Sequence, residues 1–464
     1  MSSIALALFV LGMLPIILIR PEFGILLFNW ISLMNPHELV WGPASGLPFA
    51  FVVGAVTFFA WLFSKENKKL PMTPLVVLML IFVAWCSVTT IFAYNTHDAP
   101  RIWTQYIKIM AITFLTIMMM QDRRRLTLLV IVFTVSLGYF GVKGGLFTIR
   151  SGGGDKVYGP GGMIGDNNAL AVALLMVMPF VRYLQLQVSQ RWQRWGIFGC
   201  LGLILISILG SYSRGAFLGL ACSAMVLALK SRHKVGFGIL VAAVLAAGLA
   251  FMPDKFSNRM ETIETYEEDQ SAYYRLNSWH FAMNFAAAHP LGGGFDVSSV
   301  QSLWHYAPDP SRVQVAHSIY FEVLGSQGFP GLFVFLAIIV LAFRTAGTIV
   351  KRTRNRPDLV WLRDLGAMGQ VSVVAFSTGG AFLSIPFHDV FWDVVAIIVV
   401  AREIMVRELA KPAPQAVPTR TGAVSPFGRR QTGPLMPEPQ VAPGSALQGS
   451  GRPFRQRSSR FRPI

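Results

Sequence analysis

The chain has 464 residues, of which 53% are hydrophobic and only 14% are charged. A soluble globular protein carries about 25% charged residues, so this composition excludes an ordinary soluble domain. Many apolar runs approach the ~20 residues that a helix needs to cross a bilayer. They form continuous blocks and lack the alternation of a transmembrane barrel. We therefore predict an all-α polytopic membrane protein, because helices satisfy their own backbone hydrogen bonds in lipid.

The apolar runs predict where the membrane spans lie. The first two are short and separated only by Arg20-Pro21-Glu22, so they form either a hairpin or one broken helix. We expect about 12 spans in total. In chain order, the apolar segments are 4–19, 23–34, 46–64, 75–93, 104–120, 125–141, 167–185, 195–211, 213–230, 235–252, 317–343, 366–382 and 389–406.

The connections between these segments alternate in charge, which predicts the orientation. The basic set contains Lys65, Lys68 and Lys69, Arg123 to Arg125, Arg182, Arg191 and Arg194, Lys230, Arg232 and Lys234, and the stretch from Arg344 to Arg363. The other set has far fewer cations and comprises 35–45, 94–103, 142–166, 211–214, 253–316 and 383–388. Basic loops stay in the cytoplasm, so the second set is expected to face outward.

This orientation predicts four parts of the chain, of which one is a large outward loop. The loop is expected to be mainly helical, with an amphipathic helix over 273–287. The C-terminal part is rich in Pro, Gly, Ser and Arg and is expected to be a disordered basic tail in the cytoplasm. Its arginines suit contact with membrane lipids, and no nucleic-acid partner is expected. The parts are transmembrane helices over 1–252, the outward loop over 253–316, transmembrane helices over 317–406, and the tail over 407–464.

Two arginines and one histidine are the main candidates for chemistry on the outward side. Arg214 follows a short Gly-Ser-Tyr-Ser turn, and Arg275 lies beside Tyr274 in the predicted loop helix. A planar guanidinium binds phosphate oxygens through two hydrogen bonds. His317 lies where loop and membrane meet, and an interfacial histidine can act as a general base. The simpler interpretations are a snorkelling arginine, an ion pair between Arg275 and the acidic stretch 261–269, and an ordinary helix-end histidine.

Weaker candidates for substrate binding lie at other outward positions. Asp166 and Asn168 end a Gly-rich loop before a helix, where Asp166 can equally be the helix N-cap. Lys108 lies inside an apolar run, and charge inside a membrane is functional by default. Asp389 follows His388 at the last outward turn, and Arg101 adds a further cation. The loop histidines His280, His289 and His305 have no partners at metal spacing, so neither a metal nor another cofactor is expected.

These residue types suit an anionic, phosphate-bearing lipid substrate, because arginines can neutralise charge on a diphosphate leaving group. The chain contains, in this order, the short motifs Ser213-Arg214-Gly215, Arg275 with Trp279, His317-Ser318, Gly325 and Gly328-Phe329-Pro330-Gly331-Leu332. With these motifs, the chain resembles the O-antigen ligase/polymerase superfamily over roughly residues 1–405. The N-terminal pattern Leu33-Met34-Asn35-Pro36-His37 resembles the ligase branch found beside exosortase-type exopolysaccharide systems.

The resemblance implies a GT-C-type glycosyltransferase of the Gram-negative inner membrane. It implies transfer of a glycan from undecaprenyl diphosphate to the lipid A–core oligosaccharide on the periplasmic side, without metal and with inversion. Arg214 and Arg275 would bind the diphosphate, and His317 would activate the acceptor hydroxyl. An O-antigen polymerase or a protein O-oligosaccharyltransferase uses the same donor and remains open. A lipid-linked glycan transporter, with charged residues toward the bilayer midplane, and a non-catalytic assembly protein are alternatives of different classes.

Overall fold

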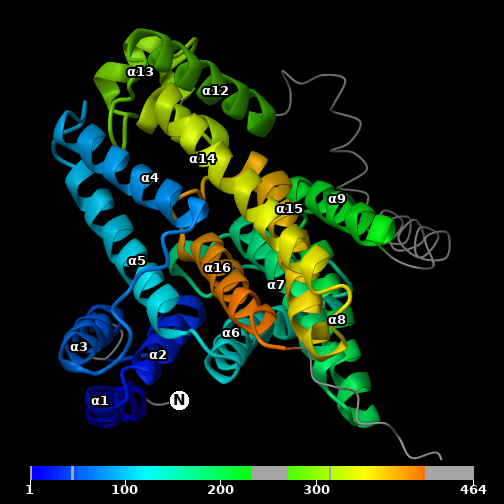
Figure 1. Ribbon diagram of the computed structural model, residues 1–464. Coiled ribbons are helices and arrows are strands. Elements are labelled where there is room, and N and C mark those ends of the chain that lie inside the picture. Colours follow the sequence, from blue (N-terminus) through cyan, green and yellow to red (C-terminus); the bar gives the residue numbers. More distant parts are fainter. Residues whose placement is uncertain (1–2, 43–45, 231–269, 313–314, 413–464) are drawn as a thin grey trace, which may run out of the picture. The chain divides into compact units, whose positions relative to one another are not determined.

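The computed structural model describes residues 3–42, 46–230, 270–312 and 315–412, and every regular element in these ranges is a helix. They belong to one compact unit, Met1–Pro414. The α-helices (Figure 1) are α1 (Ser3–Ile19), α2 (Glu22–Met34), α3 (Phe49–Phe63), α4 (Pro74–Ile91), α5 (Ala99–Met119), α6 (Arg123–Arg150), α7 (Asn167–Gln187), α8 (Arg191–Gly210), α9 (Arg214–Lys230), α12 (Gln270–Ala288), α13 (Val300–Tyr306), α14 (Ile319–Arg352), α15 (Val360–Gly379) and α16 (Asp389–Leu409). Short 3-10 helices are η1 (Gly162–Ile164), η2 (Pro310–Arg312), η3 (Pro357–Leu359) and η4 (Gly380–Phe382).

The helices agree with the predicted apolar segments. Each segment within the described residues is a helix, with Arg20 and Pro21 separating α1 from α2. The segment 235–252 and all but the start of the predicted tail lie outside the described residues. Among the described helices, 7 are long and apolar enough to cross a membrane, namely α4, α5, α6, α7, α8, α14 and the stretch Pro357–Phe382 that contains α15. The chain is therefore a multi-pass membrane protein, while the count of about 12 spans stays a prediction.

Several predicted boundaries were wrong. Helix α14 continues to Arg352 and α15 begins at Val360, within the stretch expected as a basic loop. Helix α6 continues to Arg150, also through residues expected in a loop. Two glycines in this stretch face α8. A Cβ on Gly145 would lie 2.1 Å from the Leu203 carbonyl oxygen, and one on Gly144 would lie 2.3 Å from Ser207 Oγ. Small residues let membrane helices approach each other closely, so the contact with α8 favours continuation of the helix.

The helix α14 bends at Gly328, which has φ 67° and ψ −170°. The chain that follows α12 packs against this bend, since the Phe329 N–H donates to the Pro290 carbonyl at 3.0 Å. A Cβ on Gly328 would lie 2.3 Å from the same carbonyl oxygen. A bend frees backbone groups inside the bundle, and the Trp85 indole N–H donates to the Gln327 carbonyl at 2.8 Å. The chain after α12 and the helix α14 are therefore in direct backbone contact.

Aromatic rings hold the turn between α15 and α16. Phe376 and Phe391 stack with centroids 3.9 Å apart, which joins the two helices. The ring centroid of Phe387, in the turn itself, lies 5.3 Å from that of Tyr106 and 4.8 Å from that of Phe295. Each aromatic pair adds about 0.5–1.5 kcal/mol beyond area burial. The turn therefore has a fixed place beside residues 270–312, which are named the outer segment after their predicted side of the membrane.

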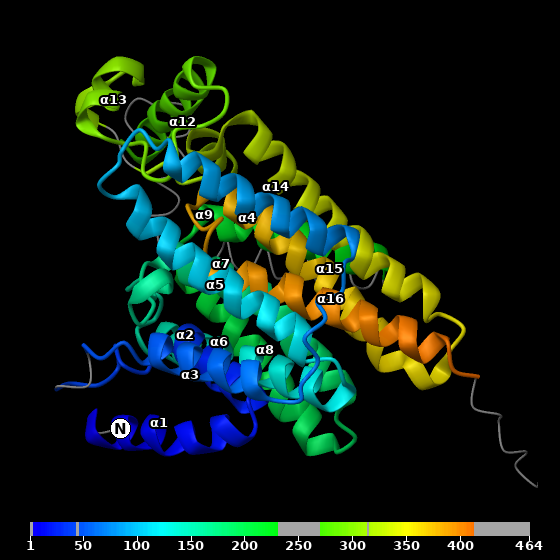
Figure 2. The same cartoon turned by 60° about the vertical axis from the view of Figure 1, so that its left-hand side comes forward.

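The outer segment contains the predicted helix, since α12 spans the range 273–287. Both α12 and α13 lie at the end of the helices where α14 begins (Figures 1 and 2). The Tyr94 backbone N–H, after α4, donates to the Gly293 carbonyl at 2.7 Å, which fixes the far side of the segment. The start of α14 is therefore covered by α12. The boundaries predicted for the whole loop, 253–316, stay a prediction because 253–269 lie outside the described residues.

The bend gives a test of this arrangement. We expect Gly328→Ala to lower the melting temperature of the detergent-solubilised protein by several degrees. An alanine there must adopt a positive φ, which costs about 1–3 kcal/mol, and must displace the Pro290 carbonyl. Gly325→Ala is the matched control, because its nearest contact would be an ordinary 3.5 Å. Heating followed by size-exclusion chromatography measures both, and equal melting temperatures would contradict the close backbone contact.

Candidate functional site

His317 lies in the connection between the outer segment and α14. It is half-buried and adopts φ 45°, in the left-handed region. Few residues other than glycine occupy this region, and the conformation costs of order 1–3 kcal/mol. Its backbone N–H donates to Ser384 Oγ at 2.9 Å, from the turn between α15 and α16. The backbone of the candidate base is thus fixed by a side chain from a distant segment.

Trp279 of α12 joins three segments of the chain. Its indole N–H donates to the Ala316 carbonyl at 2.8 Å. Its ring stacks on Phe321 of α14, with centroids 5.0 Å apart and planes 12° apart, and lies 6.4 Å from Phe382 of η4. Arg275 precedes Trp279 by one helical turn, so both lie on the same face of α12. The helix therefore presents Arg275 toward the start of α14.

The charge of Arg275 acts on His317. Burial lowers the pKa of His317 from 6.5, the positive charge of Arg275 lowers that pKa further, and the carboxylate of Asp166 raises it. Burial and the arginine prevail, so the imidazole is neutral at pH 7 and can accept a proton. The structure thus brings together three residues that the sequence placed on one face of the membrane.

Arg214 is the first residue of α9 and is half-buried. The preceding Ser213 caps the helix, since its hydroxyl accepts from Ala216 N–H at 3.3 Å. A Cβ on Gly215 would lie 2.9 Å from Phe382 Cβ, so this glycine allows α9 to approach η4 closely. Phe382 is the ring that also lies beside the α12 indole. Arg214 therefore starts a helix that packs against η4, and η4 also lies beside Trp279 of α12.

Asp166 has the capping role that its position before a helix predicts. Its Oδ1 accepts from Asn168 N–H at 2.7 Å and from Ala169 N–H at 3.0 Å, at the start of α7. The neighbouring Asn167 side chain donates to the Ser211 carbonyl at 2.8 Å, which ties α7 to the turn before α9. Roles of Asp166 and Asn168 in substrate binding stay predictions.

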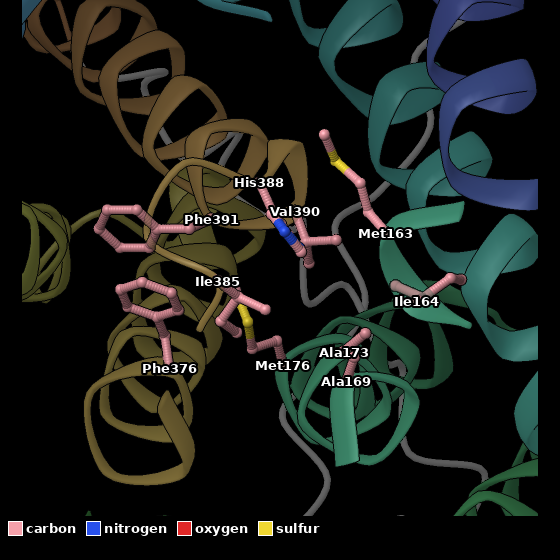
Figure 3. Close-up of a pocket in the computed structure, with 10 residues that line it drawn as sticks. All are labelled: Met163, Ile164, Ala169, Ala173, Met176, Phe376, Ile385, His388, Val390 and Phe391. Carbon is pink, nitrogen blue, oxygen red and sulfur yellow. The ribbon is translucent and has the colours of Figure 1, made fainter. Parts of the chain in front are cut away.

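His388 faces a small cavity between α7, α15 and α16 (Figure 3). Met176 and Phe391 are among its lining side chains, and its volume is about 10 Å³. That space holds at most about one water molecule, so it does not admit a sugar. Burial lowers the pKa of His388 from 6.5, against the opposing charges of Asp389 and Asp166. His388 is therefore a neutral side chain in the wall between the helices.

Two weaker candidates have local partners away from His317. Arg101, at the start of α5, is exposed and lies within electrostatic range of Asp98 and Asp296. Lys108 of α5 is also exposed, and its ammonium lies 5.1 Å from the centre of the Phe51 ring of α3. A cation over a ring face is a stabilising contact in its own right. Substrate binding by either residue stays a prediction.

Two further candidates also have structural contacts. Asp389 begins α16, is buried, and accepts a hydrogen bond from the Ser32 hydroxyl of α2. Tyr274, next to Arg275 in α12, is half-buried, and its ring lies 6.4 Å from that of Tyr273. Asp389 thus joins two helices, and Tyr274 lies on the helix that carries the candidate arginine.

Two polar residues at His317 belong to no motif in the sequence. Glu322 lies in the first turn of α14, where its Oε2 is buried with no hydrogen-bond partner among the described residues. The Ser384 hydroxyl, which accepts from the His317 backbone N–H, lies near the same carboxylate. An acid inside the apolar segment 317–343 was a visible signal, because charge in a membrane span marks function. Ser384, in the turn between α15 and α16, has no comparable sequence feature that indicates a function.

The residues around His317 have the chemistry for anion binding and proton acceptance. Half-buried Arg275 lies within electrostatic range of the neutral His317, and half-buried Arg214 starts a helix that packs against η4. Within the described ranges, no group of three or more His, Cys, Asp or Glu side chains could hold a metal ion. Anion binding beside a proton acceptor suits displacement of a phosphate-bearing leaving group by a hydroxyl.

Residues 199–336 match a family model described as O-antigen ligase. Residues 1–187 match a family of unknown function, DUF5935, and no curated protein matches the chain. The first match supports a place in the O-antigen ligase/polymerase superfamily and indicates a glycosyltransferase-like activity of ligase or polymerase type. Arg214, Arg275 and His317 all lie within that matched range, whereas Asp389 lies beyond both.

The electrostatic contact predicts how His317 titrates. With diethyl pyrocarbonate labelling followed by peptide mass spectrometry, we expect a midpoint below 6.5 for His317. Arg275→Gln should raise this midpoint because a neighbouring positive charge is removed, and Asp166→Asn should lower it. The exposed His280 of α12 serves as the internal control for overall accessibility. One common midpoint in the three proteins would show that these charges do not act on His317.

Proposed function

We propose that this protein is an O-antigen ligase, which transfers a glycan from undecaprenyl diphosphate to a hydroxyl of the lipid A–core oligosaccharide. The observation that carries the proposal is a neutral, half-buried His317 within electrostatic range of Arg275, in the part of the chain that matches the O-antigen ligase family. The chain is a multi-pass membrane protein, which suits a donor whose lipid remains in the bilayer. We infer a GT-C-type enzyme.

In this reaction Arg275 and Arg214 bind the diphosphate of the donor. A guanidinium offers two parallel N–H donors to phosphate oxygens and stays charged at any physiological pH. As the bond between the anomeric carbon and the diphosphate oxygen breaks, negative charge grows on the leaving group. Positive charge placed there beforehand stabilises the transition state more than the bound donor.

His317 acts on the acceptor. Its neutral imidazole takes the proton of the acceptor hydroxyl while that oxygen bonds to the anomeric carbon. The bond to the diphosphate breaks on the opposite face, so the configuration inverts and undecaprenyl diphosphate leaves. The reaction proceeds without a metal, because the arginines supply the positive charge and the histidine the base. The proton then passes from the imidazolium to solvent.

We place this site in the periplasm of a Gram-negative cell, with the protein in the inner membrane. The support is the charge of the connections, since basic loops are retained in the cytoplasm. The stretch that carries Arg275 and ends before His317 belongs to the sparsely charged set. A lipid-linked glycan that has crossed the membrane is then within reach of the site.

Reconstitution tests the reaction. The purified protein is mixed with undecaprenyl-diphosphate glycan and rough lipopolysaccharide, in the presence of chelator. We expect a glycan ladder on the lipid A–core and at least a hundredfold lower rate for His317→Ala, Arg275→Ala and Arg275→Lys, because lysine lacks the bidentate fork. His280→Ala and Arg150→Gln, both exposed in the wild type, should keep activity.

Several outcomes of this assay would contradict the proposal. Ligation that requires a divalent metal would exclude a metal-independent reaction. Ligation that survives His317→Ala together with Arg275→Ala would show that neither residue is needed. Glycan growth on the lipid carrier with none on lipopolysaccharide would identify a polymerase. Movement of the donor across vesicles without a new glycosidic bond would identify a transporter.

The pH dependence gives a second test. His317 acts in its neutral form, so kcat/KM for the donor, which reports the donor-free enzyme, should rise with pH and level off above a midpoint that lies below 6.5. Asp166→Asn should shift this acid limb to lower pH, because the carboxylate that favours the imidazolium is removed. Initial rates of ligation are measured at pH values on both sides of this midpoint, and the stability of the protein is checked at each pH. A rate that falls as pH rises across the midpoint would exclude histidine as the base.

A further inference from the structure

A larger cavity lies at the opposite ends of α15 and α16 from the turn that contacts His317. The start of α6, η3 with the start of α15, and the end of α16 line it, and its volume is about 420 Å³. Small-molecule pockets occupy about 300–1,000 Å³, so this cavity is large enough for a ligand. The proposed reaction uses none of the residues that line it.

Two arginines that line the cavity are held in place by uncharged groups. The Arg123 guanidinium lies 4.8 Å from the ring centre of buried Trp361, a cation–π contact. Arg407 Nη2 donates to the Gln121 backbone carbonyl and, at 2.9 Å, to Gln121 Oε1. Neither arginine has a carboxylate within ion-pair distance among the described residues. Both positive charges therefore remain without an ion pair in that part of the chain.

The acidic residues of the cavity have cationic partners of their own. The pairs are Asp358 with Arg356 at 2.8 Å, Glu408 with Lys411 at 2.6 Å and Asp122 with Arg125 at 3.3 Å. Arg125 also pairs with Glu66, but the Asp122 side chain is 55% exposed, so solvent screens its charge. The two arginines consequently give the cavity an excess of positive charge.

The cavity lies at the ends of membrane helices. The candidate spans Arg123–Arg150 and Pro357–Phe382 both begin at its wall. Buried Leu359 and Ile404 add apolar surface beside the charged groups. The basic connections predict that this end faces the cytoplasm, where the leaflet carries anionic lipids. Basic pockets between membrane helices on that side bind phosphate-bearing headgroups.

We propose that this cavity binds the phosphate of an anionic phospholipid headgroup from the cytoplasmic leaflet. The Arg123 guanidinium and Arg407 Nη1 donate no hydrogen bond to the described residues, so their N–H groups can donate to phosphate oxygens. A lipid bound there joins α6 to α16 through its phosphate and contacts α15 at Trp361. A ligand that binds only the folded protein stabilises it, so the lipid raises the melting temperature.

Thermal unfolding in detergent tests the site. Protein freed of lipid in a neutral detergent is heated with phosphatidylglycerol or with phosphatidylcholine, and the folded fraction is measured by size-exclusion chromatography. We expect phosphatidylglycerol to raise the melting temperature by several degrees and phosphatidylcholine to leave it unchanged. The half-saturating concentration of phosphatidylglycerol should rise at least tenfold when Arg123→Gln and Arg407→Gln are combined.

A matched control separates this site from general attraction to a basic protein. Arg352→Gln combined with Arg354→Gln removes the same charge from two exposed arginines on the same predicted side of the membrane. Neither of these arginines lines the cavity. The half-saturating concentration should therefore stay within about twofold of the wild-type value.

A second measurement needs only the wild-type protein and decides the matter if the double variant does not fold. Phosphatidylglycerol with a photoreactive diazirine in its headgroup is crosslinked to the protein, and the modified peptides are mapped by mass spectrometry. We expect modification within 121–123, 358–361 and 404–411, and its loss with excess unmodified phosphatidylglycerol. Inorganic phosphate at millimolar concentration should not compete.

Four outcomes would overturn the proposal. Equal stabilisation by phosphatidylcholine would show that headgroup charge does not matter, and equal weakening in the control variant would show general attraction. Crosslinks confined to other segments would place the lipid elsewhere. Inorganic phosphate that alone stabilises the protein and blocks crosslinking would identify a site for a soluble anion. No readout uses ligation, so the result is independent of the proposed function.

Discussion

The arrangement of the outer segment depends on a contact between two backbones at the bend of α14. A Cβ on Gly292 would lie 2.5 Å from the Gln327 carbonyl carbon, and one on Gly328 would lie 2.4 Å from Gly292 N. Only glycines fit at such a distance, and both have positive φ. The contact joins the end of α12 to the first half of α14. The helix that carries Arg275 and the helix that follows His317 therefore form one structural unit.

The positions of the helices could be predicted from the sequence far better than their ends. An apolar run is a local property, and helix formation in lipid follows from it. The end of α6 depends on a partner, because Gly144 and Gly145 place its last turns against α8. The bend of α14 likewise depends on the chain after α12. Contacts between residues distant in sequence decide such boundaries, and a single sequence does not reveal them.

The candidate site was predictable to a similar degree. Arg275 and His317 were candidates because a cation and a base at a predicted outward membrane boundary are unusual, and the structure places them within electrostatic range of each other. The partners of Arg101 and Lys108 were not predictable, since Asp296 and Phe51 lie in other segments. A polar residue that serves another residue, such as Ser384, becomes visible only when the fold brings the two together.

The contact between Arg275 and His317 also has a consequence for the order of events in the proposed reaction. In the absence of donor, the arginine lowers the proton affinity of the histidine. A diphosphate bound to Arg275 brings negative charge that offsets this effect, because the two charges act on the imidazole with opposite sign. His317 then becomes a stronger base once the donor is in place. In the proposed reaction, the arginine that stabilises the leaving group therefore also couples activation of the acceptor to the presence of a donor.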